Sequence, residues 1–178
     1  MPLYFAYGSN LDRGAMTARC PGSAPVGPAR LARHRLVIMR EGYASVIRDP
    51  RREVRGLLWR LALADVPALD RYESVASGLY VKRQVPVLTA SGPRLATLYI
   101  GRNAGPGVPR PGYLEAVLAA ARELGLPAAY LAGIAALGRT GRSAGEDSAP
   151  AGPVVRPTRR SPRDASRPPE PRGWTWSP

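Results

Sequence analysis

Tyr4-Phe5-Ala6-Tyr7-Gly8-Ser9-Asn10-Leu11 (YFAYGSNL) lies close to the N-terminus and combines two local signals. Its aromatic and apolar first half is typical of a buried strand. The three residues from Gly8 to Asn10 favour a turn, and a helical pattern begins at Leu11. A strand that enters a helix through such a loop directs several backbone N–H groups at one point, which suits a bound carboxylate or phosphate. The alternative is an ordinary strand-to-helix turn without a ligand.

Length and composition predict one soluble, globular domain. The chain has 178 residues, of which 44% are hydrophobic, and no apolar run approaches the ~20 residues of a membrane span. Met1-Pro2-Leu3 leads directly into the first expected strand, so we expect no signal peptide. Cys20 is the only cysteine, which rules out an internal disulfide and favours a cytoplasmic location.

The net charge of +13 comes almost entirely from arginine, because Lys82 is the only lysine. A charge of this sign suits nucleic acid, anionic small molecules or simply solubility. No basic patch interleaved with aromatic residues accompanies it, and no recognised nucleic-acid motif appears. We therefore do not expect nucleic acid to be the main partner.

Hydrophobic periodicity and turn residues predict mixed helices and strands up to residue 138. Asn10 or Asp12 is expected to cap a helix over 12–20. The prolines at 21, 25 and 28 indicate a connection, and Asp49-Pro50-Arg51-Arg52 a turn. Strands are expected at 30–40, 42–49, 54–63, 79–89 and 94–100, and helices at 65–73, 111–125 and 128–137. Gly56 inside a strand indicates a bulge or a close backbone approach.

Residues 139–178 differ in composition from the rest and contain eight of the 20 prolines. Apart from Val154 and Val155 they have almost no aliphatic side chains, so they cannot bury enough apolar surface to offset the entropy of ordering. We expect one domain over 1–138 and a disordered basic tail over 139–178, with Trp174 and Trp176 either docked or in solvent.

Glu73 is the candidate for chemistry, because it falls at the end of the expected helix 65–73 among Leu69, Tyr72 and Val75. A carboxylate in such surroundings loses solvation, and its pKa rises toward neutrality. A general acid or base that works near pH 7 needs such a pKa. The alternative is a solvated glutamate at a helix end.

Other catalytic constellations are weak. His34 is the only histidine, so no multi-histidine metal site exists. Ser9 has no evident base partner, and no Gly-rich phosphate-binding motif is present. A cofactor-free enzyme that uses one carboxylate is the interpretation that remains.

Three blocks of the sequence together resemble the gamma-glutamyl cyclotransferase family. They are YFAYGSNL at 4–11, LDRYESVASGLY at 69–80 and PRPGYLEAVLAAARELGLPAAYL at 109–131, and VRGLLWRL at 54–61 is similar to a family strand. The resemblance covers about residues 3–137. It implies an α+β fold built on a small closed mixed β-barrel with helices around it.

The resemblance also implies an activity and a set of site residues. Family enzymes release 5-oxoproline and a free amine or amino acid from a gamma-glutamyl amide, without a cofactor or metal. Glu73 matches the catalytic glutamate. The expected substrate-binding residues are Tyr4, Phe5, Ala6, Tyr7, Gly8, Ser9, Asn10, Tyr80 and Tyr113. Ser74 departs from the family, since many members have glycine there.

The chemistry fits these roles. The substrate's own α-amine is the nucleophile, and Glu73 would take a proton from it and return one to the leaving nitrogen. Tyr80 could hydrogen-bond Glu73 or the substrate carbonyl. Two rivals are a non-catalytic module that binds small carboxylates on the same fold, and a basic nucleic-acid accessory protein. Neither the substrate's amine nor the oligomeric state follows from the sequence.

Overall fold

The computed structural model describes the backbone of residues 1–146 and the side chains as far as residue 139. The strands are β1 (Leu3–Ala6), β2 (Ala24–Ile38), β3 (Ala44–Arg60), β4 (Tyr80–Thr89) and β5 (Gly92–Gly101). The helices are α1 (Arg13–Arg19), α2 (Val66–Tyr72), α3 (Tyr113–Glu123) and α4 (Ala128–Glu146), with short 3₁₀ turns η1 (Ser9–Leu11) and η2 (Leu63–Asp65). The predicted tail from residue 147 on, with Trp174 and Trp176, lies outside the described residues.

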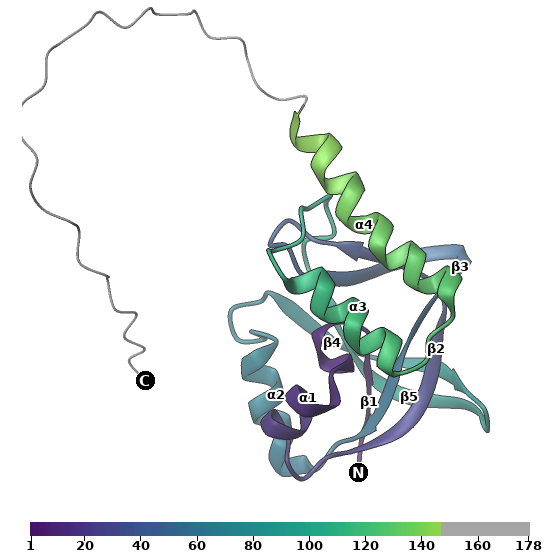
Figure 1. The fold of residues 1–178 in the computed structure, drawn as a ribbon. Coiled ribbons are helices and arrows are strands. Elements are labelled where there is room, and N and C mark those ends of the chain that lie inside the picture. The colour runs from purple at the N-terminus through teal and green to yellow at the C-terminus, as the bar shows by residue number, and fades with distance from the viewer. Residues whose placement is uncertain (147–178) are drawn as a thin grey trace, which may run out of the picture. The chain divides into compact units, whose positions relative to one another are not determined.

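The five strands close into a barrel in the order β1-β3-β2-β4-β5 (Figure 1). β1 runs parallel to β5, with Tyr4 opposite Thr97, and antiparallel to β3. The other neighbouring strands are antiparallel. Figure 1 shows α1 and α2 at the lower end of the barrel as drawn, with α3 and α4 above them. The predicted closed mixed barrel flanked by helices is confirmed.

Apolar side chains form two buried clusters, one on each face of the sheet. Phe5 of β1 packs with Leu58 of β3 and Leu98 of β5 inside the barrel. Tyr4 and Ala6, which alternate with Phe5, belong to the cluster between the barrel and the helices. This alternation follows from the two-residue period of a strand. It places β1 at the centre of both cores.

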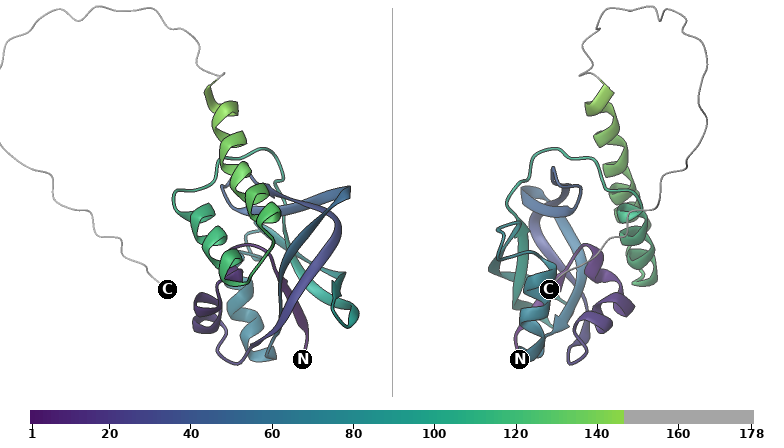
Figure 2. Two further views of the ribbon diagram at one scale, coloured as in Figure 1. Left: turned by 45° about the vertical axis from the view of Figure 1, so that its right-hand side comes forward. Right: turned by 90° about the vertical axis from the view of Figure 1, so that its left-hand side faces the viewer.

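Two predicted breaks in the barrel strands are wrong. β2 already begins at Ala24, and it accommodates Pro25 because the register with β3 shifts between Pro25 and Gly27. Proline is tolerated at such irregular positions. β3 continues through the predicted turn at 49–52. The register with β2 shifts a second time there, so that these four residues of β3 lie opposite the single residue Arg33 of β2. Figure 2 shows β2 and β3 as one long paired ribbon.

The predicted end of the last helix at Gly138 is also wrong, because α4 continues to Glu146. A Cβ at Gly138 would lie 3.1 Å from a methyl group of Leu114, so the missing side chain lets α4 approach α3 closely. The predicted domain boundary after residue 138 stays a prediction. Within the described part of the chain, no helix combines the length and apolar character needed to cross a membrane.

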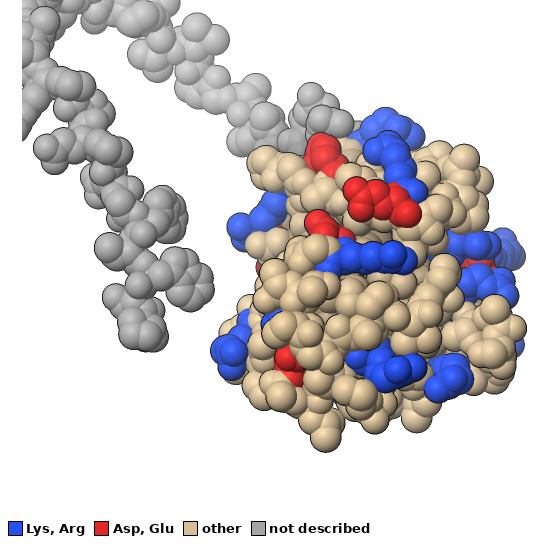
Figure 3. All heavy atoms as spheres, turned by 60° about the horizontal axis from the view of Figure 1, so that its bottom comes forward, with Lys and Arg blue, Asp and Glu red and all other residues tan. Residues whose placement is uncertain are grey.

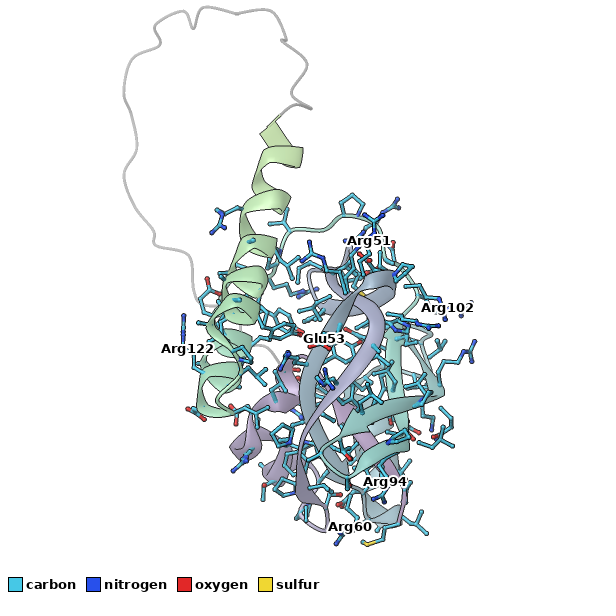
Figure 4. The ribbon with its side chains drawn as sticks, turned by 90° about the vertical axis from the view of Figure 1, so that its right-hand side faces the viewer. Arg51, Glu53, Arg60, Arg94, Arg102 and Arg122 are labelled. Carbon is cyan, nitrogen blue, oxygen red and sulfur yellow. The ribbon has the colours of Figure 1, made fainter. Side chains whose placement is uncertain are left out.

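Basic side chains are spread over the molecule. On the face shown in Figure 3 they alternate with acidic and uncharged residues. Figure 4 labels Arg51 and Arg60 of β3, Arg94 of β5, Arg122 of α3 and Arg102 after β5. In this view Arg51 and Arg102 lie at the upper right, Arg60 and Arg94 at the lower end, and Arg122 at the left beside the helices. The figure also labels Glu53, which forms ion pairs with Arg30 and Arg55. That nucleic acid is not the main partner stays a prediction.

Candidate active site

The N-terminal stretch forms one wall of the site as a strand, a 3₁₀ turn and a helix. β1 ends at Ala6, and Gly8 precedes η1. The backbone N–H of Leu11 donates to the Gly8 carbonyl with a nitrogen–oxygen distance of 3.0 Å. Asp12 then caps α1, because its carboxylate accepts from the Ala15 N–H at 3.0 Å. The predicted cap at Asp12 is confirmed. This turn places Asn10 in the interior with 2% of its surface exposed.

Glu73 is positioned by the way α2 ends. The N–H of Val75 donates to the Asp70 carbonyl, and the N–H of Ser74 donates to the Arg71 carbonyl, each with a nitrogen–oxygen distance of 3.0 Å. This pair of bonds is a Schellman motif, which requires a left-handed residue just after the helix cap. Ser74 fills that position with φ +52°, and Glu73 is the cap residue itself. The turn directs the Glu73 side chain away from solvent.

α2 begins where it was predicted, but the expected side-chain cap by Asp65 is absent. Asp65 precedes the helix as expected, but its side chain caps no backbone N–H. Its carboxylate instead accepts a hydrogen bond from the Ser23 hydroxyl at 2.7 Å. That buried bond ties the start of α2 to the segment that leads into β2.

One small pocket collects most of the predicted residues. Its lining residues are Tyr4, Tyr7, Gly8, Ser9, Asn10, Ala44, Glu73, Tyr80, Tyr99 and Tyr113. Phe5 and Ala6 are not among the lining residues, and both are fully buried in the core. The predicted substrate contacts of these two residues are therefore not supported by their positions. They support the wall rather than form it.

Asn10 and Glu73 meet inside this pocket, although they are 63 positions apart in the chain. The Asn10 side-chain nitrogen donates to a Glu73 carboxylate oxygen at 2.8 Å and to the Tyr4 hydroxyl at 2.9 Å. Arg19 donates to the side-chain oxygen of the same Asn10. The Glu73 carboxylate is thus fixed by the Asn10 amide, which Arg19 fixes in turn through its other end.

Burial raises the pKa of Glu73 from 4.5 to about 7. The positive charge of Arg19 and the hydrogen bonds of Asn10 and Tyr4 act in the opposite direction, and the charge of Asp70 raises the pKa further. Glu73 has 9% of its surface exposed. The alternative of a solvated glutamate at a helix end is therefore wrong.

The hydroxyl of Tyr80 does not bond Glu73. It donates to the Ala44 carbonyl at 2.7 Å, while the Tyr113 hydroxyl accepts from the Ala44 N–H at 3.1 Å. Of the two partners expected for Tyr80, the Glu73 carboxylate is thus replaced by the Ala44 carbonyl at the start of β3, and the substrate carbonyl stays a prediction. Burial raises the pKa of both tyrosines, so both are neutral hydrogen-bonding groups at pH 7.

The sequence did not reveal three residues of the site, namely Ala44, Tyr99 and Arg19. Tyr99 reaches the pocket because β5 pairs with β1, and its hydroxyl donates to an Asp70 carboxylate oxygen at 2.5 Å. The contact of Arg19 with Asn10 depends on how α1 folds back from η1. No short motif carries any of these contacts. Among the described residues, no group of three His, Cys, Asp or Glu could hold a metal ion.

A closed barrel whose small pocket holds one buried, hydrogen-bonded carboxylate among tyrosines has the chemistry that an acid–base enzyme for a small molecule requires. Residues 53–134 match the AIG2-like family. Over 139 residues the chain is 34% identical to Gamma-glutamylcyclotransferase of Mus musculus and 33% identical to that of Homo sapiens. Each alignment covers 72% of this chain and 74% of the relative.

A solved structure of a gamma-glutamyl cyclotransferase is also similar, with a TM-score of 0.70 and 32% identity. The superposition covers 76% of this chain and 86% of the other. The chain belongs to the gamma-glutamylcyclotransferase family, as its three sequence blocks predicted.

Proposed function

We propose that this chain is a gamma-glutamyl cyclotransferase that releases 5-oxoproline and a free amine or amino acid from a gamma-glutamyl amide. The observation that carries the proposal is the buried Glu73 carboxylate, which Asn10 holds at 2.8 Å in a pocket lined by tyrosines. Two relatives at 33–34% identity that bear the name Gamma-glutamylcyclotransferase support it. A cytoplasmic location belongs to the same proposal.

The substrate contains both reacting groups. Its α-amine nitrogen forms a bond to the δ-carbonyl carbon, and the amide C–N bond to the leaving amine breaks. A pocket that folds the substrate into this pose supplies proximity, which is worth several kcal/mol of barrier. Because nucleophile and electrophile are on one molecule, the reaction as we propose it requires no cofactor.

Glu73 moves the proton in this scheme. It removes a proton from the α-ammonium group and later returns a proton to the leaving nitrogen. With a pKa of about 7, the carboxyl is present in both forms near neutral pH, as a group that first accepts and then donates requires. Asn10 keeps the carboxylate in place during both transfers.

The other pocket residues bind the substrate. We assign the α-carboxylate, or the developing oxyanion, to the backbone N–H groups around Gly8 and Ser9. The neutral hydroxyls of the tyrosines complete the polar wall. The proposed substrate contacts are Tyr4, Tyr7, Gly8, Ser9, Asn10, Tyr80 and Tyr113.

A substrate panel with one matched pair of variants tests the proposal. The purified full chain is incubated with gamma-glutamyl amino acids and gamma-glutamyl amines, and 5-oxoproline is measured by mass spectrometry. Glu73→Gln keeps the shape of the side chain but cannot accept a proton, so turnover should fall by at least ~10²-fold. Glu123→Gln, an exposed position on α3, is the control and should keep full turnover.

Two results contradict the proposal. Full activity of Glu73→Gln removes Glu73 from the mechanism. Absence of 5-oxoproline from the whole panel, with binding of a gamma-glutamyl compound retained, favours the module that only binds small carboxylates.

A further inference from the structure

The side-chain amide of Asn10 is oriented by its three partners. A guanidinium group only donates hydrogen bonds, so the Asn10 oxygen must face Arg19. The NH₂ group then faces Glu73 and the Tyr4 hydroxyl, at 2.8 and 2.9 Å. If the amide turned over, a nitrogen would face the guanidinium and an oxygen would face the carboxylate. Arg19 therefore determines which end of Asn10 meets Glu73.

Arg19 is itself held in place by contacts on the side of Asn10. Its guanidinium carbon lies 3.3 Å from the centre of the Tyr72 ring, a stacked cation–π contact. The Tyr72 hydroxyl shares a 2.9 Å hydrogen bond with the Ser9 hydroxyl. Arg19 is also the last residue of α1, where a positive charge is favourable. The guanidinium thus connects η1, α1 and the end of α2 around one amide.

We propose that Arg19 is a positioning residue for Glu73, which acts through the Asn10 side chain to hold the carboxylate in its reactive orientation. Its effect on turnover rests on the proposed function, whereas its effect on the carboxylate does not. The charged and titratable groups that act on Glu73 are Arg19 of α1, Asp70 of α2, Tyr4 of β1, Tyr7, Tyr80 of β4, Tyr99 of β5 and Tyr113 of α3. Of these, Arg19 carries the positive charge.

The test compares four full-length proteins, namely the wild type, Arg19→Met, Arg19→Lys and the control Arg13→Met. Methionine keeps much of the apolar stem but removes the charge and the donors, and lysine restores both. Arg13 is an exposed arginine of the same helix, so its variant loses the same charge outside the pocket. Two NMR signals are followed with pH, the ¹³C resonance of the Glu73 carboxyl and the side-chain NH₂ resonance of Asn10. Turnover is measured over the same pH range.

In Arg19→Met we expect the Glu73 titration midpoint to rise, since the group that favours the ionised form is gone, and the Asn10 NH₂ signal to move or broaden. Below the midpoint, each unit of rise lowers the ionised fraction roughly ten-fold. The value of kcat should therefore fall most at acid pH, with a smaller change in KM. Arg19→Lys should recover most of the wild-type behaviour, and Arg13→Met should match the wild type throughout.

Unchanged Glu73 and Asn10 signals in Arg19→Met would overturn the proposal, whatever happens to turnover. If Arg19→Met does not fold, Arg19→Ala replaces it, since it also removes both the charge and the donors for Asn10. Unchanged Glu73 and Asn10 signals in that variant would likewise overturn the proposal. If the wild type forms no 5-oxoproline, the proposed function fails, and the two NMR signals still decide the role of Arg19.

Discussion

At the scale of single residues, Glu73 links the site to the stability of the fold. Its pKa is about 7 in the folded chain and 4.5 as its ordinary value. Between these two values the folded chain holds the proton more tightly than the unfolded chain. The contribution of Glu73 to stability is therefore present below about pH 4.5 and is lost as pH rises through about 7.

Replacing this carboxyl should remove that pH dependence. We expect the free energy of unfolding of Glu73→Gln, relative to wild type, to be higher at pH 8 than at pH 5, by about 3 kcal/mol at most. Urea denaturation of both proteins at the two pH values measures the difference. Other titrating groups cancel in this comparison, so an equal difference at both pH values would show that Glu73 is not held with a raised pKa.

Ser74 is a second residue with a measurable cost. Its φ of +52° fills the left-handed position of a Schellman motif, whereas α3 ends in the same motif with Gly125 at φ +71°. A left-handed residue with a side chain costs roughly 1–2 kcal/mol, and glycine avoids this. We expect Ser74→Gly to raise the free energy of unfolding by about 0.5–1 kcal/mol, because the gain is partly offset in the unfolded chain.

Ser74→Ala is the control for this change, since it removes the hydroxyl but keeps the strain. It should not be more stable than the wild type in the same urea experiment. A glycine variant less stable than the wild type would mean that the hydroxyl, not the backbone, decides the preference at this position.

At the scale of elements, the contact of β1 with β3 depends on Gly56. A Cβ at this position would lie 2.1 Å from the Ala6 carbonyl oxygen and 2.9 Å from the Phe5 ring. The predicted close backbone approach at Gly56 is thus confirmed. Because β1 carries Tyr4 and leads into η1, the same contact sets the position of the pocket wall.

Gly56→Ala should therefore destabilise the barrel by about 2 kcal/mol or more, since the backbone has to move. Gly133→Ala is a matched control on α4, where an added Cβ meets nothing within 4 Å. There the change should stabilise the chain by about 0.5–1 kcal/mol through helix propensity. Urea denaturation measures both, and a Gly56→Ala protein as stable as the wild type would contradict the close contact.

At the scale of the whole molecule, we expect the described residues to carry both stability and activity. Residues 147–178 are rich in proline and arginine and poor in aliphatic side chains. A chain cut after Glu146, where α4 ends, should melt within about 2 °C of the full chain and keep its turnover. Scanning calorimetry and the 5-oxoproline assay measure this. A melting temperature lower by more than about 10 °C would show that the removed segment contributes to the core.

Local patterns in the sequence were sufficient for the parts of the fold that local forces decide. The aromatic strand before Gly8, the cap at Asp12 and the helix end at Gly125 were predictable, because each depends on residues a few positions apart. The local sequence left Glu73 open between a buried carboxylate and a solvated residue at a helix end, and the family resemblance favoured the first. The closed barrel was expected only through the family resemblance.

Only the tertiary structure decided how these pieces combine. The bond from Asn10 to Glu73 joins residues 63 positions apart, and the bond from Tyr80 to Ala44 joins residues 36 positions apart. Tyr99 reaches the same pocket from another strand, β5. The continuity of β3 through Asp49-Pro50-Arg51-Arg52 has the same origin, because β3 pairs with β2 on both sides of these residues, at Arg48 with His34 and at Glu53 with Ala32. Such contacts are selected by closure of the barrel and by burial over the whole chain, and no local spacing encodes them.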